Sequence, residues 1–322
     1  MSLGRPGAAL TLDGDRLTAA EAALAALQVE LGVGNAHDRF RAALGGISRF
    51  AGVAAGASAV VELGYGDDLE TVLTGTVTSV ERRPWGLVVE GLAATFSLSR
   101  TRLGRSYVSQ TAGDIASDLV TSANGTAGEI SSSLSLSAYH ADERRSVWSH
   151  LCSLAQLAGC ELSSEGDGSV NFRPPKSGSP DHTFRHGAEL VAWDVGPRDT
   201  VQTDISVVPF GAASEQGSEK WHVVLREPDG GAPSDETLVP GALRDRDGAQ
   251  TYEKALRDAR TRRGSGGDVL VGGDAAVRAG DVLTLDDVPG AGSDPLRITA
   301  ATHRLGGDTG FFTLMQVEGV AP

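Results

Sequence analysis

Lysine is almost absent from this 322-residue chain, in which only Lys176, Lys220 and Lys254 accompany a plentiful supply of arginine. Acidic residues outnumber basic ones by 42 to 28, which gives a formal net charge of −14. Binding to nucleic acid requires clustered lysine and arginine side chains, whereas an acidic surface mainly provides solubility. The composition therefore argues against nucleic acid as the main partner.

Long apolar stretches are also missing. No run of about 18 apolar residues occurs, so we expect no transmembrane helix and no membrane partner. The N-terminal residues MSLGRPGAALTLDGDRL contain no apolar core of signal-peptide length. We expect no signal peptide, and a protein that stays in the cytoplasm until something else exports or releases it.

Cysteine is rare, since the chain contains only Cys152 and Cys160. Both lie in one predicted helix and its exit, and eight helical residues span roughly 12 Å, which is too far for a disulfide. We expect free thiols that pack as small hydrophobic groups in a reducing compartment. His150 is two residues from Cys152, so on a helix the two side chains point apart and a Cys–His nucleophile is not expected.

The chain lacks the motifs of common catalytic and cofactor sites. It contains no G-x-S-x-G elbow, no H-E-x-x-H and no phosphate-binding loop of the Walker type. Gly32-Val33-Gly34 lacks the third glycine of a dinucleotide fingerprint. His182 and His186 are four apart, but the segment looks extended, which would splay the rings. We therefore predict no cofactor and no metal.

Three carboxylate pairs remain as catalytic candidates. A glycosidase needs two carboxylates that face each other across a cleft, and the sequence does not indicate such facing. Asp114 is explained as helix-start chemistry, and Asp67-Asp68 follows the turn signal Gly64-Tyr65-Gly66. We predict no catalytic residues among the pairs Asp67-Asp68, Asp114 with Asp118, and Asp286-Asp287.

Residues 1–95 are rich in strand patterns. The spacing of Thr18 and Glu21 suits a short helical turn, and the alternation from Leu27 to Val33 that follows it predicts a strand. Thr71–Glu81 and Gly86–Leu92 flank a short loop and predict a β-hairpin. Together with the runs Ala8–Leu12 and Ala59–Leu63, this block predicts a small antiparallel barrel or sandwich.

Residues 96–175 predict a helix, a second helix and a hairpin. Thr111 and Asp114 form a capping-box spacing before an apolar face that Asn124-Gly125 ends. The second helix starts at Ser146, presents Val147, Leu151 and Leu154 on one face, and ends at Gly159. An Asp167-Gly168 turn then joins Glu161–Ser164 to Ser169–Arg173.

Residues 176–322 begin in a Pro-rich linker and return to strands. One helix is predicted at about Thr251–Arg263, with Glu253 and Arg257 as a favourable pair, and the loops Gly211–Glu219 and Pro228–Glu236 interrupt the block. The predicted strands are Thr183–His186, Leu190–Val195, Val201–Pro209, Trp221–Leu225, Val282–Leu285, Leu296–Thr302 and Phe311–Val317. The fold class expected for the whole chain is α+β and mostly β.

Several short motifs occur in a characteristic order. Near the C-terminus these are Arg278-Ala279-Gly280-Asp281-Val282, Thr302-His303 and Gly310-Phe311-Phe312-Thr313. Earlier come Leu98-Ser99-Arg100 leading to Leu119, and Ser146–Gly159 followed by Ser169–Phe172. The ordered set resembles the late control D proteins, which are the central hubs of contractile phage tails and whose fold also forms the N-terminal part of the VgrG spikes of type VI secretion.

This resemblance implies a homotrimer in which each subunit carries two tail-tube-like β-barrel domains, residues 1–95 and 176–322, around a helix-helix-hairpin middle domain, residues 96–175. Three subunits then offer six barrels to a hexameric inner tube protein, and the other face seats a trimeric spike protein among other baseplate proteins. Because VgrG chains continue beyond this hub whereas this one stops at Pro322, we expect a separately encoded spike.

Two other functions are compatible with the sequence. One is a tail-associated cell-wall hydrolase, which lysis of peptidoglycan by the purified chain would reveal. The other is a stand-alone β-rich binding module, which would be a monomer with aromatic-lined clefts, although aromatic residues make up only 5% of the chain.

Overall fold

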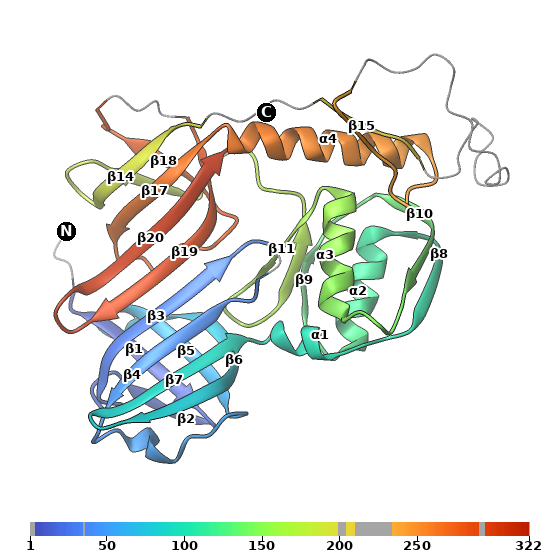
Figure 1. The fold of residues 1–322 in the computed structure, drawn as a ribbon. Coiled ribbons are helices and arrows are strands. Elements are labelled where there is room, and N and C mark those ends of the chain that lie inside the picture. The colour runs from blue at the N-terminus through green and yellow to red at the C-terminus, as the bar shows by residue number, and fades with distance from the viewer. Residues whose placement is uncertain (1–3, 35, 199–203, 210–233, 290–293, 322) are drawn as a thin grey trace.

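A computed structural model describes residues 4–34, 36–198, 204–209, 234–289 and 294–321. Strands dominate, which confirms the prediction of a mostly β chain of the α+β class. Two barrel-like units of strands stand one above the other, and a helical unit lies beside them (Figure 1). No helix in the described ranges has both the length and the hydropathy needed to cross a membrane.

The first barrel is an antiparallel sheet with the strand order β3-β4-β7-β6-β5-β1-β2. The predicted hairpin is present, with β6 and β7 joined by only Pro84 and Trp85. The Thr18–Glu21 spacing gives a single turn, in which the Thr18 N–H donates to the Glu21 carboxylate (3.0 Å) before β3 begins. The strands are β1 Pro6–Leu12, β2 Asp15–Thr18, β3 Leu24–Gly32, β4 Arg39–Gly45, β5 Ser58–Tyr65, β6 Asp68–Arg83 and β7 Gly86–Ala93, with a short 3-10 helix at Arg49–Gly52.

The second barrel has the strand order β14-β17-β20-β19-β18-β13, and an isolated bridge between His186 and Leu190 brings β13 back to β14. The β13–β18 pairing and the His186–Leu190 bridge are parallel, and the pairings of β14, β17, β18, β19 and β20 with one another are antiparallel. Its strands are β13 His182–Arg185, β14 Leu190–Pro197, β17 Ser265–Gly272, β18 Val282–Asp286, β19 Leu296–Gly306 and β20 Gly310–Gly319.

The helical unit has its own hydrophobic core, built mainly from α2 and α3. Thr111 and Asp114 form the predicted capping box of α2, and Ser146 caps α3, which ends at Gly159 with φ of +64°. Its elements are α1 Phe96–Arg100, β8 Arg105–Thr111, α2 Ala112–Ser122, β9 Ala127–Ile130, β10 Ser135–Ala141, α3 Val147–Ala158, β11 Glu161–Ser164 and β12 Val170–Arg173.

A later segment packs on the same core. It contains β15 Ile205–Val207, β16 Glu236–Leu238 and α4 Arg246–Arg263. Ile205 of β15, Leu243 before α4 and Tyr252 of α4 join the helical cluster. Asp245 caps α4 by accepting from the Gly248 N–H (2.7 Å), so the helix starts five residues before the predicted Thr251. The three-domain division stays a prediction, and the side-chain packing groups this segment with residues 96–175.

The two barrels share one 13-stranded sheet and one hydrophobic cluster. β3 of the first barrel pairs directly with β19 of the second (Figure 1). Of the predicted elements in the polar insert, strand Trp221–Leu225 and loop Gly211–Glu219 lie outside the described residues, as do parts of Val201–Pro209 and Pro228–Glu236.

Candidate assembly site

The joint between the barrels is an antiparallel ladder that runs from Ala26↔Gly306 to Gly32↔Ala300. At its end the Val33 N–H donates to the Thr299 carbonyl (3.0 Å). Backbone groups alternate in direction along a strand, so the odd-numbered residues of β3 bond β19. The side chains of these residues, Leu27, Val29 and Leu31, are buried in the shared core.

The hairpins β6–β7 and β19–β20 have the same irregularity. Thr78 forms a bulge opposite Glu90, and Thr299 forms a bulge opposite Gln316. Each threonine donates its hydroxyl hydrogen across the bulge, Thr78 to the Glu90 carbonyl (3.3 Å) and Thr299 to the Gln316 carbonyl (3.1 Å). Bulges are specific features of a fold, so the two hairpins are equivalent units.

The backbone on the other side of each bulged strand is also equivalent. In the first barrel Gly56 N–H donates to the Val77 carbonyl (2.8 Å), and in the second Gly280 N–H donates to the Ile298 carbonyl (2.7 Å). Both glycines have positive φ, +96° and +97° respectively. This conformation favours glycine, which explains why the Gly-Asp motif begins with Gly280.

A further bulge relates β3 to β14. The pairing of β3 with β4 shifts at Ala25, and the pairing of β14 with β17 shifts at Val191. The matching hairpins and the matching bulges in β3 and β14 define two copies of one four-strand unit, β6-β7-β4-β3 and β19-β20-β17-β14. The two copies meet in the sheet where β3 pairs with β19.

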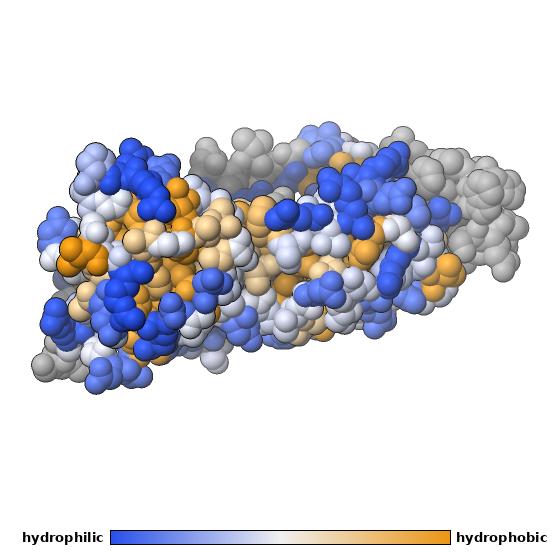
Figure 2. Space-filling model, turned by 90° about the horizontal axis from the view of Figure 1, so that it is seen from below, coloured by the Kyte–Doolittle hydropathy of each residue, from blue (hydrophilic) through white to orange (hydrophobic). Residues whose placement is uncertain are grey.

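Each unit has an edge that nothing in the described part of the chain pairs. Beyond the bridge at Leu190, β14 bonds only β17, and the end of β6 from Ser79 to Arg83 bonds only β7. Exposed apolar side chains lie at both places, Val191 in β14 and Trp85 in the turn after β6, each with 54% of its surface exposed. Seen from below, hydrophobic atoms reach the surface over the first barrel (Figure 2).

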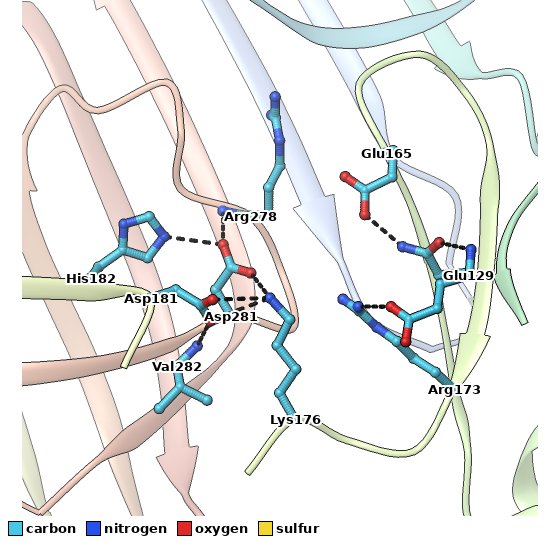
Figure 3. A network of polar contacts seen from close by, with 10 residues as sticks. Glu129, Glu165, Arg173, Lys176, Asp181, His182, Arg278, Asp281 and Val282 are labelled. Atoms are coloured by element: carbon cyan, nitrogen blue, oxygen red, sulfur yellow. Dashed lines mark hydrogen bonds and ion pairs between the residues drawn. The ribbon is translucent and has the colours of Figure 1, made fainter. Parts of the chain in front are cut away.

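Asp281 connects the linker to the second barrel (Figure 3). Its carboxylate accepts from Lys176 Nζ (2.7 Å), His182 Nε2 (3.1 Å) and the Arg278 backbone N–H (3.0 Å). Burial acts to raise the pKa of Asp281, but the hydrogen bonds and charges of His182 and Lys176 outweigh it and hold this pKa below its usual value. The motif aspartate therefore has a structural role.

Arg278 connects the two barrels, and Asp38 connects the first barrel to β11. The Arg278 guanidinium donates to the carbonyls of Thr71 (2.8 Å) and Val72 (3.3 Å) in β6. Asp38, before β4, accepts from the Gly32 N–H (2.8 Å) and from the Ser164 hydroxyl. Burial raises the pKa of Asp38 to about 6, against the effect of these hydrogen bonds.

His303, the second motif residue, is fully buried between strands. Its Nε2–H donates to the Val277 carbonyl (3.2 Å), and Nδ1 lies 3.0 Å from the hydroxyl of Thr313, the last residue of the Gly-Phe-Phe-Thr motif. Burial and the nearby Arg278 charge lower the pKa of His303 to about 4. A neutral imidazole in β19 that bonds Thr313 of β20 and the segment before β18 is a structural group.

The two thiols line a cleft of about 840 Å³ beside α3 and α4. Both are free, and burial raises the pKa of each to about 11, so at neutral pH they are protonated and poor nucleophiles. His150 points elsewhere, to the Tyr139 hydroxyl (3.0 Å) and the Asp142 carbonyl (3.0 Å).

The histidine and carboxylate pairs have separate partners. His182 bonds Asp281, whereas His186 contacts the Trp193 ring. Asp118 accepts from Arg105 (2.6 Å) and Tyr107 (2.7 Å), and Asp114 caps α2. Asp287 forms an ion pair with Arg185 (3.4 Å), and Asp67-Asp68 lies at the β5–β6 turn. Among the described residues no group of three or more His, Cys, Asp or Glu is arranged to hold a metal.

No protein-family model and no curated protein matches this sequence. Solved structures match its fold over nearly the whole chain. A tail protein from Neisseria meningitidis has a TM-score of 0.74 at 14% identity, covering 98% of this chain and 96% of the other. The 43 kDa tail protein of prophage MuSo2 from Shewanella oneidensis has a TM-score of 0.70 at 12% identity, covering 97% of each chain.

A third solved structure comes from a secretion system. It is an Escherichia coli component of the type VI secretion system, described as similar to T4 bacteriophage tail proteins, with a TM-score of 0.63 at 11% identity. The match covers 93% of this chain and 76% of that one. The chain therefore has the fold of phage tail and type VI secretion proteins.

Proposed function

We propose that this protein is the non-enzymatic baseplate hub of a contractile phage tail or a phage-tail-like injection particle. In this role a homotrimer joins a hexameric inner tube to a separately encoded trimeric spike. The observation that carries the proposal is the repeated four-strand unit, because it gives one chain two equivalent barrels. The fold shared with tail proteins supports it.

The repeat explains how a threefold assembly could match a sixfold one. Two equivalent units per chain and three chains present six similar modules to a tube. The remaining part of each chain, with α2, α3 and α4, has no second copy in the described residues, so it keeps threefold symmetry and suits a trimeric spike. Contacts of this head-to-tail type must close into a ring.

The buried polar groups support a structural role. Asp281, His303 and Arg278 bond backbone or neighbouring side chains that hold the barrels and linker together. Residues of these types carry out chemistry in enzymes, but here hydrogen bonds within the fold occupy them.

Native mass spectrometry of the purified chain tests the assembly. We expect a species of three chains of 33.2 kDa each, and electron micrographs of affinity-purified particles should place the protein between tube and spike. A protein that stays monomeric and joins neither would refute the proposal. Clear lysis in peptidoglycan zymography, lost on changing a carboxylate pair, would instead favour a hydrolase.

A further inference from the structure

We infer that β14 of one copy pairs antiparallel with the end of β6 in the next copy, in the same register in which β3 pairs with β19 within one chain. This rests on the proposed trimer and specifies its contact. Eight strands of each copy, from β6 to β14, would then continue into the next copy and close a ring.

The register follows from the bulges. Gln28 of β3 lies three residues after the bulge at Ala25, and Asp194 of β14 lies three residues after the bulge at Val191, so the two positions are equivalent. In the same way, Arg304 of β19 and Arg83 of β6 each lie five residues after the bulged threonine of their strand. Because Gln28 pairs with Arg304 in the joint, the copied register pairs Asp194 with Arg83. The neighbouring pairs are Gly196↔Glu81, Val195↔Arg82, Trp193↔Pro84 and Ala192↔Trp85.

The apolar side chains of the β3–β19 joint are buried, whereas the equivalent side chains at the open edges are still partly exposed, as expected if a second copy covers them. At the joint, Leu27, Val29 and Ala301 are buried. Their equivalents, Trp193, Val195 and Val80, are apolar and only partly buried at the rim of the same core. Pairing would cover them and would also bring exposed Trp85 beside β14, where exposed Val191 lies. Removing such apolar surface from water favours association.

The charges are complementary as well. Asp194 and Arg83 occupy a pair that exchanges no backbone hydrogen bonds, because the odd-numbered residues of β3 make those bonds in the joint. Side chains at such pairs lie closest together, and opposite charges there are favourable. In the free chain Arg83 contacts Glu81 on its own strand, and in the ring it would face both carboxylates.

Proline limits the strength of this contact. Pro197 of β14 and Pro84 after β6 each lack the N–H that their equivalents Leu31 and Leu305 have. The Val195↔Arg82 pair keeps both backbone bonds, whereas the two flanking pairs keep one each. The contact between copies should therefore be weaker than the joint within the chain, and the side chains should contribute more to it.

A disulfide test reads the register directly. The Cα atoms of a pair without mutual backbone bonds are about 4.5 Å apart, within the range that a disulfide spans. We expect oxidation of the Asp194→Cys, Arg83→Cys double variant to give covalent trimers on non-reducing gels. The control Asp194→Cys, Arg41→Cys places the second thiol on β4, away from the edge, and should stay single-chain, as should wild type with its native thiols.

Charge exchange provides a second measurement that needs no oxidation. Arg83→Asp or Asp194→Arg alone should shift the trimer to dissociation at concentrations where wild type is assembled, and the double exchange should restore it. A native trimer that neither cross-links at this pair nor responds to the exchange would overturn the inferred contact but leave the proposed hub intact. A wild-type protein that is monomeric and absent from tails would overturn both.

Discussion

Protonation of Asp38 should stabilise this fold. Asp38 is 6% exposed, and its pKa is about 6 in the folded protein against an ordinary value of 3.8. Since one pKa unit corresponds to about 1.36 kcal/mol, the shift is equivalent to about 3 kcal/mol. Because the folded pKa is the higher one, this stabilisation is fully present below about pH 3.8 and is lost as pH rises to about 6.

Asp38→Asn is the substitution that tests this. An asparagine keeps an oxygen to accept from the Gly32 N–H and carries no charge, so it resembles the protonated acid at every pH. In urea unfolding, the free energy of the variant minus that of wild type should be near zero at pH 4. It should increase by up to about 3 kcal/mol by pH 7 and stay constant above.

The control is Asp15→Asn, which changes an exposed carboxylate in β2 of the same barrel. Its difference from wild type should stay within about 0.5 kcal/mol across the series. A difference for Asp38→Asn that does not change with pH, or that is largest at pH 4, would refute a raised pKa for a carboxylate whose burial outweighs its two hydrogen bonds.

Three further substitutions test the packing. Leu151→Asp places a charge in the fully buried face of α3 and should cost several kcal/mol in thermal or urea unfolding, whereas normal folding and assembly would show that α3 is misplaced. Asp281→Ala removes the shared partner of Lys176 and His182 and should lower the free energy of unfolding by about 2–4 kcal/mol. This is less than the loss for a fully buried ion pair, because Lys176 is part-exposed and keeps Asp181 as a partner. An equal loss in Asp181→Ala would contradict the larger role assigned to Asp281. Ser146→Ala removes the α3 cap and should lower stability by about 1 kcal/mol, and no change in the unfolding midpoint would be inconsistent with the cap geometry.

Features set by neighbouring residues could be predicted from the sequence. The Thr111–Asp114 capping box, the end of α3 at Gly159 and the Glu253–Arg257 ion pair (2.9 Å) are all present. Each depends on groups a few residues apart, whose geometry the helix itself determines. The Asp167-Gly168 hairpin turn, with β11 antiparallel to β12, was predictable for the same reason.

Features set by distant residues could not be predicted in this way. β4 and β17 were missed, although Arg39-Phe40-Arg41 alternates and Val269-Leu270-Val271 is rich in β-branched side chains. β4 pairs on one side with β7, and β17 pairs with β14 and β20, which are all distant in sequence. The roles of Asp281 and His303 depend on Lys176 and Val277, whose proximity only the tertiary structure provides.

The repeated four-strand unit could hardly be recognised from the sequence, because its two copies share backbone geometry and few side chains. The two bulged threonines and the two positive-φ glycines recur, while the surrounding side chains differ. A bulge constrains hydrogen-bond direction, whereas a strand position accepts many side chains that suit its burial.

The two types of edge in the repeat also have different requirements. β3 and β19 meet within one chain, where an apolar, fully bonded ladder carries no risk of pairing with another molecule. β14 and β6 are open before assembly, and an open edge invites aggregation. These edges pair poorly with unrelated strands, because Pro197 and Pro84 lack an N–H and Asp194 and Arg83 carry charges. The β3–β19 joint is permanent, whereas a β14–β6 contact between copies would form reversibly. The same backbone geometry with different side chains would suit both.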